Sequence, residues 1–359
     1  MKQLTVILFI LGNTSLAIHL HSQSSPSGSS VNLFGNDSIL QIGLIGDIKE
    51  LLNDRSAKSE YYKMKLVHQE GDQTKSSDIN IKTRGHFRKL KENCNYPPLL
   101  INFNDSSFKG SQLFGQNDKL KLVMPCKSEN YVIREWLAYK LYNIITPVSL
   151  QAKLVKLKMT EAKKGKEYPP LFGILIENEK DAAARVKLNV IKRELTPGQF
   201  LQENYLTMAF FQYLIGNTDW SVEYRQNVIV LVGEGDTRAI AMAYDFDHSG
   251  LVNAPYAQPA EALEMKSVSE RRYRGYCITD VATYEPIIAH YNSVKPKVYE
   301  LLNNCQLLDD KEKVSIIKYI DEFYATINDP ARFKKDFLYP CDKKGTGNVV
   351  IKGLRDDSE

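Results

Sequence analysis

The sequence predicts an α+β protein with two lobes, a strand-rich amino-terminal part followed by a helical carboxy-terminal part. Between residues 37 and 125, short segments of β-branched or alternating apolar residues are separated by turn clusters. From about residue 198, apolar residues recur at helical spacing instead. A chain of 359 residues can bury a core in each part. We therefore expect a ligand site in the cleft between two lobes.

The amino terminus is typical of an exported protein. Lys2 is followed by the apolar run LTVILFIL (4–11), which has the length of a signal-peptide core and is too short to span a bilayer. We expect a signal peptide over residues 1–21, a linker over 22–36, and a secreted or periplasmic protein. An uncleaved amino-terminal anchor is the alternative. No other stretch is long and apolar enough for a transmembrane span.

The strand-rich lobe is expected over residues 37–178. Strands are expected at 37–45, 60–67, 79–86, 98–103, 119–124, 151–159 and 171–177. A helix over 128–145 interrupts them, because Ser128 is a good N-cap and Pro147 follows its end. The strand 171–177 is almost wholly apolar, which is typical of a central strand covered on both faces.

The helical lobe is expected over residues 179–341, followed by a mobile tail over 342–359. Helices are expected at 206–215, 283–303 and 308–327. The first of these is apolar on all sides, which indicates a core helix. Two short apolar strands, 228–232 and 239–243, are joined by GEGDTR and predict a hairpin.

Charge and cysteine content narrow the function classes. The formal charge of +4 is too small to indicate a nucleic-acid partner. The basic block RRYR (271–274) is interpreted as surface, with contact to an acidic substrate as the alternative. None of the five cysteines has a CxxC spacing, which disfavours zinc. Cys94 and Cys126 flank an expected pair of strands and are the first candidates for a disulfide, with buried free thiols as the alternative.

Acidic and amide residues stand at the ends of the core helix and the hairpin. Asp219 follows the helix, Asn227 precedes the first hairpin strand, and Asp245 and Asp247 follow the second. Two carboxylates on one strand face repel each other unless a cation lies between them. Metal-dependent phosphoryl transfer needs one acid to orient a hydroxyl, and an acid and an amide to fix a metal. The pattern therefore predicts a metal-dependent phosphotransferase.

The chain resembles the CotH-like family of secreted atypical protein kinases and, more distantly, the HipA and phosphoinositide-kinase branches of the kinase-like fold. The resemblance covers roughly residues 78–260. It rests on IKTRGHFRK (81–89), LVMPCKSENYVIREWLAYKLY (122–142), FGILIEN (172–178), GNTDW (216–220) with Asn227, and YDFDHSGL (244–251). It implies a two-lobed protein-kinase-like fold that uses ATP with Mg²⁺ or Mn²⁺. It further implies phosphate transfer to Ser or Thr of an envelope or extracellular protein.

The resemblance also implies residue roles at the metal end of the site. Asp219 matches the acid that orients the acceptor hydroxyl. Asn227 and Asp245 match the metal-binding amide and acid. Asp247 matches a ligand for a second metal or a water.

At the nucleotide end, the strand 171–177 matches the hinge, whose backbone near Glu177 would meet adenine. Glu135 would pair with the basic residue that grips the phosphates. Lys121 is well placed for this by chain order, and Arg84 is the competing choice.

Two departures leave other functions open. Asp219 and Asn227 are eight positions apart, where kinases have about five. Either the intervening loop bulges or Asn217 serves instead. No glycine-rich phosphate loop is visible. A catalytically inactive binding or scaffold module, or a nucleotidyl (AMP) transferase on the same scaffold, are therefore alternatives. A glycosidase using Asp219 and Asp245 is disfavoured, since the chain has only two tryptophans for sugar platforms.

Overall fold

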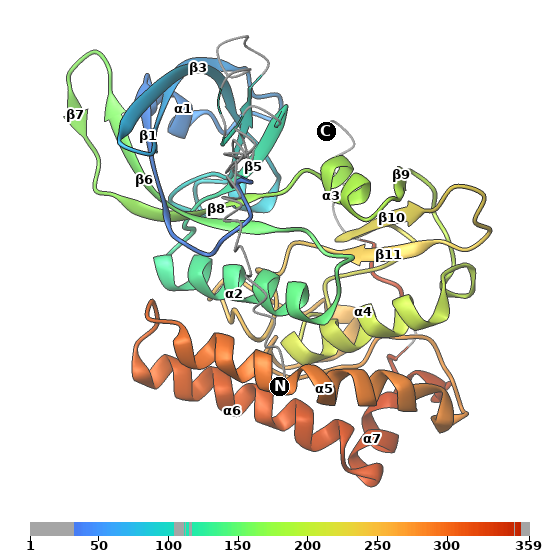
Figure 1. Ribbon diagram of the computed structural model, residues 1–359. Helices are drawn as coiled ribbons and strands as arrows, with labels where there is room; N and C mark the ends of the chain where they lie inside the picture. The colour runs from blue at the N-terminus through green and yellow to red at the C-terminus, as the bar shows by residue number, and fades with distance from the viewer. Residues whose placement is uncertain (1–31, 104–110, 112, 115–116, 348, 353–359) are drawn as a thin grey trace, which may run out of the picture.

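The computed structural model describes residues 32–352 except 104–110, 112, 115–116 and 348. The expected signal peptide and most of the linker lie outside the described residues. Within the described part, no helix combines the length and the apolar character needed to cross a membrane. Strands dominate up to residue 176 and helices dominate after it, as Figure 1 shows. The prediction of a mixed protein with a strand-rich sheet and several helices is confirmed at this level.

The strand-rich part is a sheet of eight strands that closes on itself. The strands are β1 Leu40–Gly46, β2 Tyr62–Glu70, β3 Gln73–Thr83, β4 Leu99–Asn102, β5 Lys119–Val123, β6 Ala152–Glu161, β7 Lys166–Glu167 and β8 Leu171–Ile176. Their order is β1-β2-β3-β4-β5-β8-β6-β7, and β1 also pairs with β6 in parallel. The sheet is therefore a barrel, visible as the curled strands in Figure 1.

Alternation along the strands fills the barrel interior. In β2, Met64 and Leu66 point inward and are buried, while the lysines between them are exposed. Leu44, Ile81 and Leu157 are also fully buried and belong to the same apolar cluster. The alternation of lysines and apolar residues in β2 therefore indicates a sheet with one solvent-exposed face and one buried face.

Helix α2, Glu129–Ile145, lies beneath the barrel, and α1, Ile48–Asn53, follows β1. Ser128 caps α2, since its hydroxyl accepts the N–H of Asn130 at 3.3 Å. Helix α2 ends at Ile145, two residues before Pro147. It contacts β6 and β8 on the barrel and α4 and α5 among the helices, as seen in Figure 1. This helix therefore joins the two parts of the molecule.

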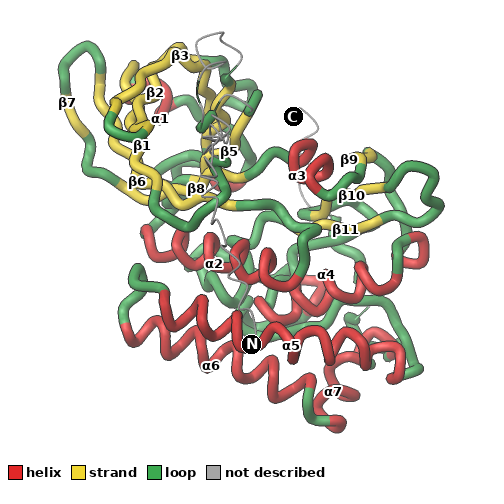
Figure 2. Tube along the Cα trace, in the orientation of Figure 1, coloured by secondary structure: helices red, strands yellow, loops and turns green. Residues whose placement is uncertain are grey.

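The second part packs helices around a small sheet. The helices are α3 Glu179–Arg185, α4 Gln202–Ile215, α5 Glu285–Asn304, α6 Asp310–Ile327 and α7 Pro330–Phe337. The short 3₁₀ segments are Phe87–Lys89, Pro197–Gln199, Glu261–Leu263, Val281–Tyr284 and Tyr339–Cys341. Strands β9 Asn189–Ile191, β10 Val228–Val232 and β11 Ile240–Ala243 form an antiparallel sheet, seen apart from the barrel in Figure 2. Helix α4 is buried along most of its length, as its apolar sequence predicts.

Two disulfides are present among the described residues. One joins Cys94 to Cys126, the pair singled out from the sequence. The other joins Cys277 to Cys341, and Cys305 is a buried free thiol. The second bond attaches the start of the carboxy-terminal tail to the segment just after the basic block 271–274.

Candidate functional site

Asp219 is fixed by the turn that ends α4. Gly216 adopts a left-handed conformation with φ of +65°, and a Cβ there would lie 2.0 Å from the Tyr319 hydroxyl. Asn217 then accepts the N–H of Asp219 at 3.0 Å and donates to the side chain of Gln212 at 3.0 Å. The amide of Asn217 is thus used inside the turn. Its role as the alternative metal amide stays a prediction.

The second acidic segment is held beside this turn by the backbone. The N–H of Gly250 donates to the Gly216 carbonyl at 3.1 Å, and the N–H of Leu251 donates to Ile215 at 2.9 Å. A Cβ at Gly250 would lie 2.5 Å from the Val268 carbonyl, so only glycine fits this approach. The two acidic segments, far apart in the sequence, are therefore fastened together.

Asn227 and Asp245 leave the same open end of the β10–β11 hairpin. Val228 pairs with Ala243, and the N–H of Tyr244 donates to the Asn227 carbonyl at 3.0 Å. Asn227 and Asp245 both have positive φ, +51° and +61°. A non-glycine residue pays about 1–3 kcal/mol for such a conformation and keeps it only where its surroundings impose it.

Two contacts hold this hairpin end in place. The Tyr139 hydroxyl, on α2, accepts the N–H of Asp245 at 3.0 Å. Phe246, between the two acids, is fully buried against Tyr142 and Phe211. The acids therefore project from a backbone anchored on both α2 and α4.

Asp219 and Asn227 meet directly. The Asn227 amide nitrogen donates to the Asp219 carboxylate at 3.0 Å and to its carbonyl at 2.8 Å. The loop between them turns back on itself through a bridge between Ser221 and Gln226. The eight-residue separation is thus accommodated by a bulged loop, the first of the two possibilities considered from the sequence.

Glu135 pairs with an arginine that the sequence analysis did not single out. Arg88 Nη1 lies 3.2 Å from Glu135 Oε2 and 3.4 Å from Asp247 Oδ2, and Nη2 donates to the Met124 carbonyl at 2.6 Å. Arg88 is therefore a partner of Glu135 that the expected choice between Lys121 and Arg84 did not include.

The path of the chain explains why Arg88 reaches Glu135. After β3 the backbone turns at Gly85, with φ of +79°, into the 3₁₀ turn Phe87–Lys89 that carries Arg88 toward α2. Lys121, on β5, instead lies over the ring of Tyr244, 5.5 Å from its centroid. The positive charge of Arg84 opposes the rise in the pKa of the Asp245 carboxyl, so Arg84 also acts on the acids.

Glu177 braces the end of β8. Its carboxylate forms an ion pair with Arg185 at 2.9 Å and accepts the N–H of Gln151 at 2.8 Å. Its own N–H donates to the Gln151 carbonyl at 2.9 Å. The N–H and the carboxylate of Glu177 are thus used within the protein, and contact of adenine with the backbone near Glu177 stays a prediction.

Glu135, Asp245 and Asp247 form one cluster of acids around Arg88. Burial raises the pKa of Asp245 to about 7, and the adjacent charge of Asp247 adds to this. Burial also raises the pKa of Glu135, against the opposing charge of Arg88. For Asp247, the charges of His248 and Arg88 outweigh burial and hold the pKa below its usual value. Burial therefore favours the protonated forms of Asp245 and Glu135 within this cluster.

Asp219 has a different environment. Burial raises its pKa, Asp247 raises it further, and the charge of His248 opposes them. Its carboxylate accepts hydrogen bonds from Asn227 at 3.0 Å and Gln226 at 3.4 Å. It is therefore a half-buried carboxylate of raised basicity at the edge of the acid cluster.

The oxygen donors suit a hard divalent cation in kind. Carboxylates of Asp245 and Asp247 and the amide of Asn227 are the ligands that Mg²⁺ and Mn²⁺ prefer. In the described part of the chain, however, no three His, Cys, Asp or Glu side chains are grouped to hold a metal. The Asp247 carboxylate already accepts hydrogen bonds from Arg88 and, at 3.0 Å, from the Tyr256 hydroxyl. Cation binding there would need Asp247 to exchange these partners.

A small pocket lies on the three-stranded sheet beside Tyr244. It is lined by Glu179, Val190, Ile191, Lys192, Arg225, Val228, Ile229, Val230 and Tyr244. Apolar strand residues form its floor, and two cations stand at its edge. No pattern in the sequence indicates this pocket, because β9 and the start of α3 lie beside the hairpin only once the chain has folded.

The basic block 271–274 was interpreted from the sequence as surface, but its arginines bind backbone carbonyls inside the protein. Arg274 donates to the carbonyls of Thr218 and Trp220, on either side of Asp219. Its other nitrogen donates to the Val349 carbonyl at 2.7 Å. Arg271 likewise bonds carbonyls at the end of α4. These arginines hold the loop that carries Asp219.

Comparisons with known proteins give little further guidance. No family model matches the chain, and no curated protein matches it. Among solved structures, it is similar to the crystal structure of a Helicobacter pylori proinflammatory kinase, CtkA. The identity is 11%, the TM-score is 0.38, and the match covers 67% of this chain and 92% of that one. A likeness at this level carries no weight for fold or function.

Proposed function

We propose that the protein is a metal-dependent phosphotransferase that moves the γ-phosphate of ATP to a Ser or Thr hydroxyl. Its barrel and helical part would be the two lobes of a kinase-like fold. One observation carries the proposal: Asp219 meets Asn227 at the open end of the hairpin that also presents Asp245 and Asp247. An acid beside an amide–acid pair is the arrangement that in-line phosphoryl transfer uses.

Asp219 is the proposed acceptor of the hydroxyl proton. Its raised pKa makes it a stronger base than an exposed carboxylate. In the step, the acceptor oxygen forms a bond to the γ-phosphorus and the bond to the β–γ bridging oxygen breaks. ADP leaves with that electron pair, and the proton of the hydroxyl goes to Asp219.

Asn227 and Asp245 are the proposed holders of Mg²⁺ or Mn²⁺, with Asp247 joining them if it exchanges Arg88. A bound divalent ion supplies neutralisation of the phosphate charge. Asp245 is well suited, because burial and Asp247 disfavour its ionised form in the absence of a cation.

The nucleotide would lie between the barrel and the three-stranded sheet. The phosphates would meet three cations of the barrel part, Arg84, Lys121 and Arg88. The pocket beside Tyr244 would take the base among the side chains of the hairpin strands.

The test is transfer of labelled phosphate from ATP with Mn²⁺ to a Ser/Thr peptide library and to the chain itself. Asp219→Asn and Asp245→Asn should each lower incorporation about 100- to 10,000-fold. Asp236→Asn, at the far turn of the same hairpin, is the matched control and should keep full activity. Equal incorporation by all four proteins would overturn the proposal. A mass gain of AMP in place of phosphate would convert it to nucleotidyl transfer.

A second candidate is a catalytically inactive nucleotide-binding or scaffold module. It is favoured by Arg88, which already occupies Asp247, and by the lack of an assembled metal-ligand group among the described residues. A rise in melting temperature with ATP and Mn²⁺, but no transfer by wild type, would support this candidate.

Export and an envelope or extracellular substrate remain part of the proposal. They rest on the sequence of residues 1–21 alone. Fractionation of cells expressing the full chain, compared with a chain lacking residues 1–21, tests this. Recovery of both in the same compartment would contradict export.

A further inference from the structure

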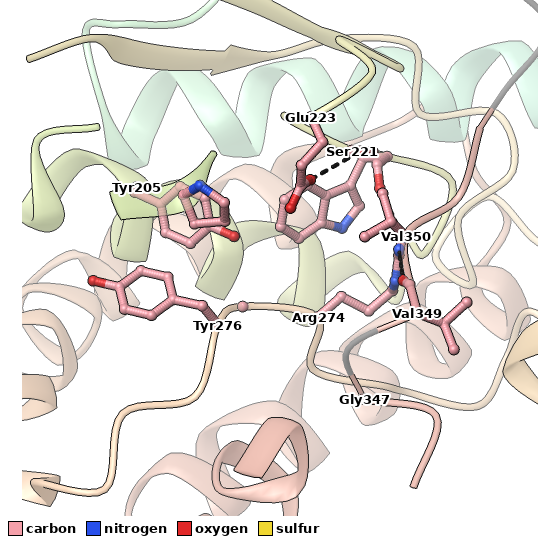
Figure 3. Close-up of a pocket in the computed structure, with 11 residues that line it drawn as sticks. Tyr205, Ser221, Glu223, Arg274, Tyr276, Gly347, Val349 and Val350 are labelled. Atoms are coloured by element: carbon pink, nitrogen blue, oxygen red, sulfur yellow. Dashed lines mark hydrogen bonds between the residues drawn. The ribbon is translucent and has the colours of Figure 1, made fainter. Parts of the chain in front are cut away.

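A second pocket lies on the other side of the loop that carries Asp219. It is lined by Pro197, Tyr205, Trp220, Ser221, Glu223, Arg274, Gly275, Tyr276, Gly347, Val349 and Val350. Figure 3 shows Tyr205 and Tyr276 at one side and Val349 and Val350 at the other, with Arg274 reaching toward the valines. We call it the tail pocket, because Gly347, Val349 and Val350 of the carboxy-terminal tail form one wall.

The tail is led to this pocket by defined contacts. Thr346 accepts a hydrogen bond from Arg272 at 2.5 Å and contacts the Tyr339 hydroxyl at 2.9 Å. Gly347 then crosses Pro340 so closely that a Cβ would lie 2.7 Å from its Cα. Because that neighbour is backbone, only glycine fits without displacing the chain. Glycine at position 347 thus allows the tail to pass close to Pro340 and to reach the tail pocket.

Beyond Gly347 the tail touches the candidate catalytic loop. Arg274 donates to the Val349 carbonyl at 2.7 Å, and the same guanidinium holds the carbonyls flanking Asp219. Lys352 lies 5.9 Å from the ring centroid of Tyr224, which stands in the loop between Asp219 and Asn227. The tail and that loop are therefore bridged at two points.

The pocket retains hydrogen-bonding capacity that the tail does not use. Trp220 is 3% exposed, and its Nε1 is buried without a partner among the described residues. Arg274 Nε is in the same condition. A buried donor left unpaired costs about 1–3 kcal/mol, so both donors favour a ligand rich in carbonyl oxygens.

The lining defines the chemistry of such a ligand. Donors from Arg274 and Trp220 match main-chain carbonyls, and the rings of Tyr205, Trp220 and Tyr276 match aliphatic side chains. Glu223 adds a negative charge at the rim. An extended peptide with adjacent aliphatic residues followed by a basic residue fits this lining, and the tail itself reads VVIK over 349–352.

We propose that the surface beneath the tail, together with the tail pocket beside it, is a docking site for extended peptides and that the tail from Gly347 to Lys352 is its exchangeable ligand in cis. The proposal concerns peptide binding alone and stands apart from phosphate transfer. The seated tail is tied to the loop of Asp219, so exchange of the tail would release that loop from one of its restraints.

The test measures binding of a fluorescein-labelled peptide of residues 347–359 by polarisation. A chain that ends at residue 346 keeps both disulfides and should bind the peptide in the micromolar range. The full chain should bind at least tenfold more weakly, because its own tail competes. A peptide with both valines changed to aspartate should not bind the shortened chain.

Two glycine variants of the full chain separate tail seating from pocket integrity. Gly347→Val should dislodge the tail and restore binding, since its side chain would clash with backbone. Gly345→Ala is the matched control and should behave as wild type, because a Cβ there meets only side-chain atoms at 3.2 Å or more.

Either of two results would overturn the proposal. The first is a shortened chain that melts cooperatively but does not bind the peptide. The second is equal peptide binding by the full chain, the shortened chain and Gly347→Val, which would mean that the tail never occupied the site. Neither readout uses ATP, so neither depends on whether the chain transfers phosphate.

Discussion

Two buried arginines flank the candidate acids, and they are satisfied in opposite ways. Arg88 is surrounded by charge, since it contacts Glu135 and Asp247. Burial alone would lower its pKa, but Tyr256 and these acids together raise it. The hydrogen bonds that Arg274 donates within the described part of the chain go to neutral carbonyl oxygens, and burial lowers its pKa to about 10.

Arg88 is therefore held in place by charged partners, whereas Arg274 can exchange one of its neutral partners, the Val349 carbonyl. Removal of Arg88 leaves carboxylates buried without a counter-charge, which is costly. The carbonyls around Arg274 carry no net charge, and the Val349 carbonyl belongs to a terminal segment. We therefore expect the Arg88 side of the site to set stability and the Arg274 side to set the order of the loop and tail.

The largest effect is expected from Arg88→Met. It should lower the free energy of unfolding by about 3–5 kcal/mol, because Glu135 and Asp247 lose their shared cation. Urea unfolding at pH 7 measures this. Lys65→Met removes an exposed ion pair with Asp78 and should cost less than about 1 kcal/mol. Similar losses in the two variants would contradict the distinction drawn above.

Next in size is a pH effect from Asp245. A carboxyl whose pKa is raised in the folded state stabilises the fold at low pH, and this stabilisation is lost as the pH rises through the folded-state value. With a shift from 3.8 to about 7, stability should fall by roughly 1–4 kcal/mol between about pH 4 and pH 8, at about 1.4 kcal/mol per unit. Asp245→Asn should flatten this dependence in urea unfolding. The same slope in both proteins would show that another group is responsible.

Arg274→Lys should have an intermediate effect. A lysine cannot reach three carbonyls in a fixed fork, so we expect a loss of about 1–3 kcal/mol. Hydrogen exchange should show faster exchange in the tail residues 347–352 and in the loop 217–226, with α2 unchanged. If only the global stability falls, Arg274 has no special hold on the tail.

The smallest effect is expected from Tyr139→Phe. It removes the acceptor for the Asp245 N–H and should cost about 1 kcal/mol. Transfer activity should fall more than stability, because the left-handed conformation of Asp245 loses its support. Tyr142→Phe is the matched control, since its hydroxyl lies 3.5 Å from the Ala243 N–H and that bond is weaker.

Elements with strong local signals were predicted well from the sequence. Helix α2 begins after the Ser128 cap and ends just before Pro147, because both residues act through local backbone chemistry. Strands β2 and β10 follow the alternation and apolar runs of their sequences. The short elements α1, α3 and β9 were not predicted, because each has seven residues or fewer and is stabilised by packing on its neighbours.

The candidate site divides along the same line. Asp219, Asn227 and Asp245 could be found because each borders a long apolar element that is recognisable in the sequence. Arg88 could not, since its direction depends on the left-handed turn at Gly85 and on the closed sheet above α2. Cys277 was not paired with Cys341 because two cysteines 64 positions apart carry no local signal of proximity.

Closure of the sheet by β1 has a consequence for how the chain can fail. β1 is hydrogen-bonded on both sides, antiparallel to β2 and parallel to β6, which lies more than a hundred positions later. Loss of this one strand would bare unpaired backbone groups on both neighbours at once, and such edges recruit strands from other molecules. Proteolysis reaching residues 40–46 should thus produce oligomers and fibrils before it produces a merely weakened monomer.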